Sequence, residues 1–101
     1  MRSNKPVSEE LLELMHIVHE NPNISQRQIA KKIGLSIGKV NYCLKALIDI
    51  GFVKVDNFNS SNQKIKYAYI LTPKGINQKI IITKQFIVKK LQEYEKLKEY
   101  I

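Results

Sequence analysis

The residues best suited to chemistry lie along one side of a helix predicted to begin at Ser36. Val40, Leu44 and Leu47 recur at helical spacing and are expected to face inward. The opposite side then presents Gly38, Asn41, Tyr42 and Lys45. Ser36 and Lys39 flank these four residues. A carboxamide can bond adenine N6 and N7, and an ammonium group can reach guanine or a phosphate. The pattern predicts a surface that reads base edges in the major groove of DNA, the alternative being an ordinary solvated helix face.

The residues around this surface fit a helix-turn-helix. That motif needs a small residue where its two helices touch, a glycine in the turn, and apolar residues at fixed intervals. Ala30 is small, and Gly34 stands where the turn is expected. The apolar contacts are supplied by Ile29, Ile33, Leu35, Val40 and Cys43.

Periodicity and capping residues predict the elements that position this motif. Three helices are expected over Ser8–Glu20, Ser25–Gly34 and Ser36–Gly51. Two strands follow, Phe52–Asp56 and Ile65–Leu71, and a long helix runs from Pro73 to Tyr100. Gly75 in the first turn of that last helix is expected to be mildly unfavourable.

The predicted fold is mainly α with a small β-hairpin, in the order ααα-ββ-α. A helix-turn-helix followed by a hairpin and another helix is the order of a winged helix-turn-helix, here with a long C-terminal helix. We expect residues 1–79 to form the DNA-binding domain and residues 80–101 to be a C-terminal helix that extends the same domain for dimerisation.

Two stretches within residues 24–79 carry a family resemblance, ISQRQIAKKIGLSIGKVNYCLKALIDIGFVKV and YAYILTPKGI. They closely resemble small MarR-type winged-helix regulators associated with bacterial exopolysaccharide gene clusters. The resemblance implies a sequence-specific, double-stranded DNA-binding transcriptional regulator of polysaccharide-related genes. Its recognition helix, residues 36–50, would enter the major groove, and its wing, residues 57–64, would lie on the backbone or in the minor groove.

Polar side chains of the wing and basic side chains of the second helix are the other candidate DNA contacts. The wing offers amides, hydroxyls and ammonium groups to phosphates or to the minor groove. These residues are Asn59, Ser60, Ser61, Asn62, Lys64 and Lys66. Arg27, with Lys31 and Lys32, could grip the backbone as the second helix crosses it. A hydrophilic loop in solvent is the alternative for the wing.

Charge supports a polyanionic partner. The formal net charge is +8. Residues 36–79 hold seven lysines and two aspartates, a net charge of +5. Cys43 is the single cysteine, so no intrachain disulfide can form, and the longest aliphatic run, residues 80–82, is far short of the about 20 residues of a membrane span. We expect a cytoplasmic protein without a membrane partner.

The last helix has more aliphatic surface than one small domain readily covers, so we expect it to pair with its copy in a homodimer. The alternative is that it folds back on its own domain. In MarR-type proteins both terminal helices build the dimer. The resemblance therefore implies dimer contacts from Leu11, Leu14, Ile87, Leu91 and Tyr94.

Other chemistry finds little support. His16 and His19 lie three residues apart, but a third metal ligand is lacking. No phosphate-binding glycine loop, nucleophile with a base, or convergent carboxylate pair is visible. We expect neither an enzyme nor a cofactor or metal. The competing functions are a non-specific nucleic-acid binder, including one for RNA, and a winged-helix module that binds protein alone.

Overall fold

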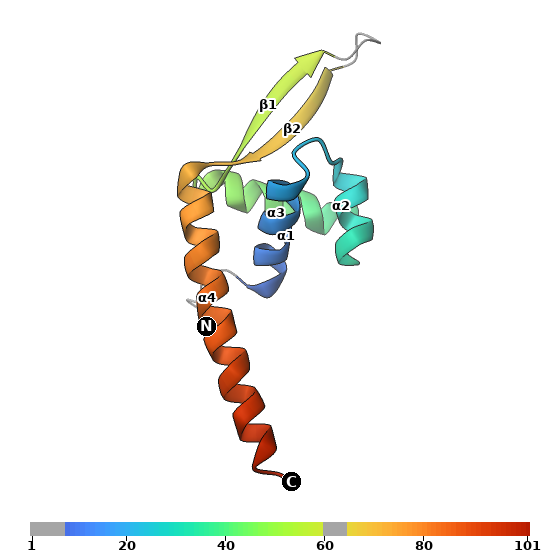
Figure 1. Cartoon of the computed structure of the whole chain (residues 1–101). Helices are drawn as coiled ribbons and strands as arrows, with labels where there is room; N and C mark the ends of the chain where they lie inside the picture. Colours follow the sequence, from blue (N-terminus) through green and yellow to red (C-terminus); the bar gives the residue numbers. More distant parts are fainter. Residues whose placement is uncertain (1–7, 60–64) are drawn as a thin grey trace.

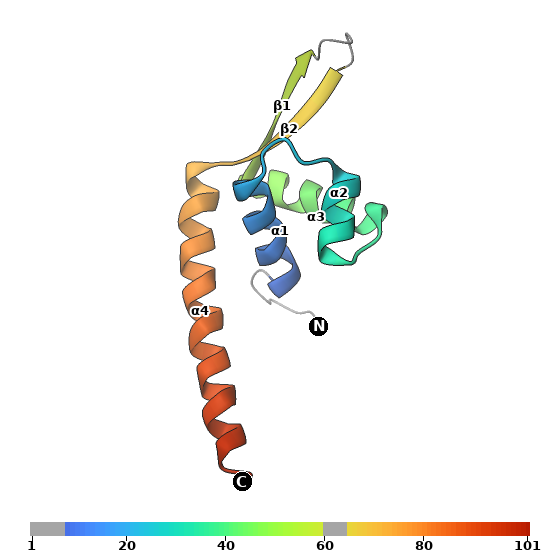
Figure 2. The same ribbon diagram turned by 45° about the vertical axis from the view of Figure 1, so that its right-hand side comes forward.

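The computed structural model describes residues 8–59 and 65–101. In these residues three helices precede a hairpin and a long helix: α1 Glu9–Glu20, α2 Gln26–Ile33, α3 Ile37–Asp49, β1 Val53–Asn59, β2 Ile65–Leu71 and α4 Pro73–Lys98. Figures 1 and 2 show the hairpin and the C-terminal half of α4 projecting in opposite directions from the group formed by α1, α2 and α3. The predicted order ααα-ββ-α is confirmed.

Each helix begins at a residue whose side-chain oxygen caps it. Ser8, Ser25, Ser36 and Thr72 all have an extended backbone, and each accepts a hydrogen bond from an amide in the first turn. At α2 the cap is reciprocal, because the Ser25 amide also donates to Oε1 of Gln28 at 2.9 Å. The helix starts are therefore determined locally, as predicted.

The helix-turn-helix forms the centre of the hydrophobic core. Ile29, Ala30, Val40 and Cys43 are buried, and the partly buried Ile33 and Leu35 pack against them. Between α2 and α3, Gly34 adopts a φ of 81°, a left-handed conformation that favours glycine. The arrangement predicted for the seven helix-turn-helix positions is confirmed.

The hairpin differs from the prediction in the length of its first strand. β1 and β2 are antiparallel, with Val53 opposite Leu71 at the base and Asn59 opposite Ile65 at the far end. β1 thus continues to Asn59 instead of ending at Asp56, and residues 57–59 of the predicted wing loop are part of a strand. The pairing with β2 outweighs the low strand propensity of asparagine.

A tight junction joins the end of α3, the base of the wing and the start of α4. Gly51 ends α3 with a φ of 82°. The carbonyl of Phe52 then accepts a hydrogen bond from the Thr72 amide at 3.0 Å, and Oγ1 of Thr72 donates to the carbonyl of Gly51 at 2.6 Å. A Cβ added at Gly75 would overlap the Phe52 carbonyl oxygen and lie 3.1 Å from Cδ1 of Leu71. The mild cost expected for a glycine in this turn stays a prediction, and the structure adds that this approach of α4 requires a residue without a side chain.

Only the N-terminal half of α4 is covered. Ile82 is buried there, where α4 packs beside α1 (Figure 2). Farther along, Lys90 forms an exposed ion pair with Glu9 of α1 at 3.1 Å, and this hydrogen bond raises the pKa of Lys90. An exposed pair of this kind contributes little stability. In residues 8–59 and 65–101 no helix is both long enough and apolar enough to cross a membrane.

The close approach at Gly75 generates a stability prediction. Gly75→Ala should destabilise the protein by about 1–3 kcal/mol, because the added methyl group meets main-chain atoms that cannot move aside. Gly38→Ala is the matched control, since its Cβ would meet only Oγ of Ser36, 4.0 Å away, and alanine favours a helix by up to about 1 kcal/mol. Urea unfolding followed by circular dichroism measures both. Equal stability of Gly75→Ala and the wild type would contradict the prediction.

The burial of Cys43 generates a reactivity prediction. The residue is 5% exposed, and burial raises the pKa of its thiol, partly offset by the charge of Lys39. Less thiolate is therefore present at pH 8 than in a free cysteine, and the sulfur is hard to reach. We expect an aromatic disulfide reagent to react with Cys43 at least about tenfold more slowly in the folded protein than in urea. Rapid reaction in the folded state would show that Cys43 is accessible.

Candidate nucleic-acid interface

The polar residues predicted on α3 share one open surface, which we call the recognition face. Ser36, Gly38, Lys39 and Lys45 are all exposed, and Tyr42 is 69% exposed. The opposite side of α3, with Val40 and Leu47, is fully buried, so the helix cannot turn to present other residues. Helical phase therefore placed these five residues correctly on the exposed side, while their role as DNA contacts stays a prediction.

Three of these residues also have partners within the chain. Oγ of Ser36 accepts from the Lys39 amide at 3.1 Å, so the hydroxyl is occupied in capping α3. The ammonium group of Lys39 lies 5.6 Å from the ring centre of Tyr42. A cation over an aromatic ring at this distance is attracted to it, which limits how freely either side chain moves.

Asn41 occupies the edge of the recognition face and is half-buried. Its Nδ2 donates to Oε1 of Gln26 at 3.4 Å, and Nε2 of Gln26 donates to the hydroxyl of Tyr69 at 2.8 Å. Gln26 was not among the predicted site residues. Its partners lie 15 and 43 positions away in the sequence, so no local pattern could have indicated this contact.

Sequence reasoning also missed two exposed residues of α3. Ile37, the first residue of the helix, is 44% exposed, and Asp49 is exposed near its end. Asp49 lies four residues after Lys45 and seven after Tyr42, a spacing that puts it on the same helical face. An apolar group can contact a thymine methyl and a carboxylate can accept from cytosine N4, so both widen the chemistry available to this face.

The remaining predicted DNA contacts lie on α2, in the strands of the wing, or outside the described residues. Arg27, Lys31 and Lys32 are exposed on α2, which packs beside α3. Asn59 and Lys66 belong to the paired strands. Four predicted wing residues lie outside the described residues: Ser60, Ser61, Asn62 and Lys64.

The predicted dimer residues divide into two groups. Leu14 is 2% exposed and lies in the core, and Leu11 is partly buried against the core. In this structure both side chains of α1 therefore pack within their own domain. Leu14 is thus covered by its own chain here, and its role as a dimer contact stays a prediction. Ile87, Leu91 and Tyr94 are all exposed on α4.

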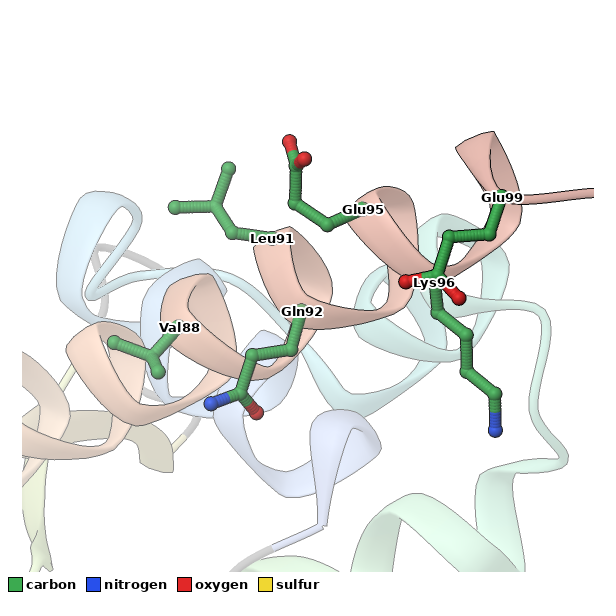
Figure 3. A pocket seen from close by; sticks show the side chains of 6 residues that line it. All are labelled: Val88, Leu91, Gln92, Glu95, Lys96 and Glu99. Carbon is green, nitrogen blue, oxygen red and sulfur yellow. The ribbon is translucent and has the colours of Figure 1, made fainter.

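A shallow hollow near the end of α4 includes one of these residues. Figure 3 shows six side chains around it, five from α4 and that of Glu99, which caps the end of the helix: Val88, Leu91, Gln92, Glu95, Lys96 and Glu99. A hollow lined by one helix has no opposite wall and cannot enclose a ligand. It is part of the uncovered surface of α4.

The structure also places the two histidines considered as metal ligands. His16 and His19 are both exposed on α1. Among the residues that the structure describes, no three histidine, cysteine, aspartate or glutamate side chains are gathered so that they could hold a metal ion.

Comparison with known proteins gives a fold-level match. A family model described as winged helix-turn-helix DNA-binding matches residues 11–54, which span α1 to the start of β1. No curated protein matches the chain.

Three solved structures illustrate the structural likeness. The transcriptional regulator SlyA is 29% identical, with a TM-score of 0.69 over 86% of this chain and 59% of its own. Streptococcus pneumoniae FabT in complex with DNA is 18% identical, with a TM-score of 0.62 over 91% and 64%. Staphylococcus aureus MarR in complex with salicylate and kanamycin is 21% identical, with a TM-score of 0.65 over 91% and 59%.

The chain spans less than two thirds of the length of each of these three proteins. The family model covers the helix-turn-helix and ends at the start of the hairpin. With the buried helix-turn-helix core, the antiparallel wing and the family match over residues 11–54, the chain has a winged helix-turn-helix fold.

Proposed function

We propose that the chain is a MarR-type transcriptional regulator that binds double-stranded DNA sequence-specifically. Residues 36–50 enter the major groove, and the wing, residues 57–64, lies on the backbone or in the minor groove. The observation that carries this proposal is the recognition face, whose polar side chains are open on a helix held rigidly from behind by Val40 and Leu47. SlyA, described as a transcriptional regulator, and FabT, solved with DNA, support it.

The finer parts of the proposal concern the target genes, the location of the protein and the absence of catalysis. Control of polysaccharide-related genes rests only on the sequence resemblance, as does membership of the exopolysaccharide-associated subfamily. A cytoplasmic location follows from the DNA target. The transcription-regulator relatives favour a protein without enzymatic activity.

The proposal includes a homodimer formed through α4. Ile80, Ile87 and Tyr94 recur every seven residues on α4, and all three are at least half exposed. A seven-residue apolar repeat is typical of a helix that pairs with another helix. We call these residues and Leu91 the α4 stripe. Two-fold pairing of the stripe would place two recognition helices in successive major grooves, about 34–36 Å apart.

The division of the chain follows from this dimer. Residues 1–79 act as the DNA-binding domain, and residues 80–101 extend it for dimerisation. Because α4 is one helix from Pro73 to Lys98, the extension continues the domain without a hinge.

Two other functions fit the same fold. A non-specific nucleic-acid binder would use the positive charge without reading bases, and a protein-interaction module would not need the lysines of α3. The charge favours nucleic acid over protein, because residues 36–79 carry a net charge of +5.

The DNA-binding proposal predicts a specific loss for two lysines of the recognition face. Selection of bound genomic fragments should yield a site bound about 10³- to 10⁷-fold more tightly than random DNA. Lys39→Ala with Lys45→Ala should weaken binding and lower the slope of log affinity against log salt by about two. Lys89→Ala with Lys96→Ala, which removes the same charge from exposed positions of α4, is the control and should change neither. Equal effects of the two pairs would indicate binding by net charge alone.

The dimer proposal predicts a change of oligomeric state. Leu91→Glu places a charge in the α4 stripe and should convert the protein to a monomer in sedimentation experiments, because a buried unpaired carboxylate opposes pairing. Gln85→Glu introduces the same group at an exposed position away from the stripe and should leave the dimer intact. A wild-type monomer at all concentrations, or a dimeric Leu91→Glu protein, would contradict the proposal.

A further inference from the structure

We infer that Gln26 and Tyr69 are positioning residues that orient the carboxamide of Asn41 for base recognition. The inference rests on the proposed function, because it explains how Asn41 prefers one base over another. Three elements meet in one row of side chains: Tyr69 from β2, Gln26 from α2 and Asn41 from α3. The two hydrogen bonds along this row connect the base of the wing to the recognition face.

Tyr69 is the fixed end of the row. Its side chain is 9% exposed and belongs to the hydrophobic core, and its backbone is paired with Val55 of β1. The hydroxyl accepts from Nε2 of Gln26 at 2.8 Å, a length typical of a well-formed hydrogen bond. A buried ring cannot follow the motions of a surface side chain, so this hydroxyl is a stationary partner for Gln26.

Gln26 is held at both of its ends. As the first residue of α2 it directly follows Ser25, whose reciprocal cap with Gln28 fixes the start of the helix. At the other end the amide nitrogen is engaged by Tyr69, so Oε1 is left to face Asn41. Such a side chain presents an acceptor in a defined place, whereas a free glutamine would sample many rotamers.

The contact orients Asn41 without using up its hydrogen-bonding capacity. A carboxamide has two N–H donors and an acceptor oxygen, and only one donor is directed to Gln26. One N–H and Oδ1 remain, which are the two groups that pair with N7 and N6 of adenine. At 3.4 Å the contact is long, so it biases the orientation of the amide while allowing the final adjustment onto a base.

An oriented amide loses less conformational freedom on binding than a mobile one. The resulting gain in affinity applies only to a base whose hydrogen-bonding groups match the amide. Tyr69 should therefore affect preference at one base pair although its ring is buried in the core. That effect separates positioning from general stability, because a merely destabilised domain would lose affinity for all sequences alike.

The test measures preference at the base pair that Asn41 reads. This base pair is identified as the one at which Asn41→Ala abolishes discrimination on the selected site. For the wild type, replacing its A·T by G·C should weaken binding about tenfold to a hundredfold. Tyr69→Phe removes only the hydroxyl, and Gln26→Met keeps the length of the side chain but removes its amide. Each substitution should reduce the ratio of the affinity for the A·T site to the affinity for the G·C site by about threefold to tenfold.

Two controls isolate the effect. Tyr67→Phe removes a hydroxyl from an exposed tyrosine two residues earlier in β2 and should leave the ratio unchanged. Adding Tyr69→Phe to Asn41→Ala should cause no further change at this base pair. In the free protein, the side-chain amide resonances of Asn41 should move in Tyr69→Phe and Gln26→Met but not in Tyr67→Phe.

The outcomes distinguish this inference from the proposed function. A selection that yields no preferred site overturns the proposed function, and this inference with it. A preferred site whose ratio is the same in the wild type, Tyr69→Phe and Gln26→Met overturns the inference alone. Thermal unfolding of each variant checks that it is folded, and Gln26→Met, altered outside the core, keeps the test valid if Tyr69→Phe is unstable.

Discussion

The close contact between the main chain of Phe52 and the first turn of α4 is the constraint on which the rest of the structure depends. The Phe52 carbonyl receives the Thr72 amide, and α4 approaches so closely that Gly75 leaves no room for a Cβ. At this point α3 has just ended, the wing begins and returns, and α4 starts. One main-chain contact therefore determines the relative directions of the recognition helix, the wing and the long final helix.

This constraint links the two surfaces used in the proposed function. The recognition face lies on α3 and the stripe lies on α4, and Thr72 joins the end of α3 to the start of α4 by hydrogen bonds with Gly51 and Gly75. A long helix transmits the direction of its first turn along its whole length. The spacing of two recognition helices in a dimer would thus be determined by how α4 leaves the domain, and only secondarily by contacts near Tyr94.

Much of the fold could be predicted from the sequence because its determinants are local. Caps such as Ser25 with Gln28 act within four residues, and the turn at Gly34 depends on its own φ. The features that the sequence did not indicate are those that depend on a distant partner. Gly75 meets a carbonyl 23 residues earlier, and Asn57 and Asn59 become strand residues only through pairing with β2. Composition carries no record of such partners.

The same distinction between local determinants and distant partners applies to the candidate site. Helical phase separates the inward from the outward side of α3, so Tyr42 and Lys45 were placed correctly from spacing alone. A residue at the boundary of the two sides is different, because its surroundings come from neighbouring elements. Asn41 is at that boundary, and its partners are contributed by α2 and β2. The tertiary fold can therefore give such a residue a defined orientation, and a base-reading amide benefits from this more than a lysine does, because two hydrogen bonds to one base require a fixed plane.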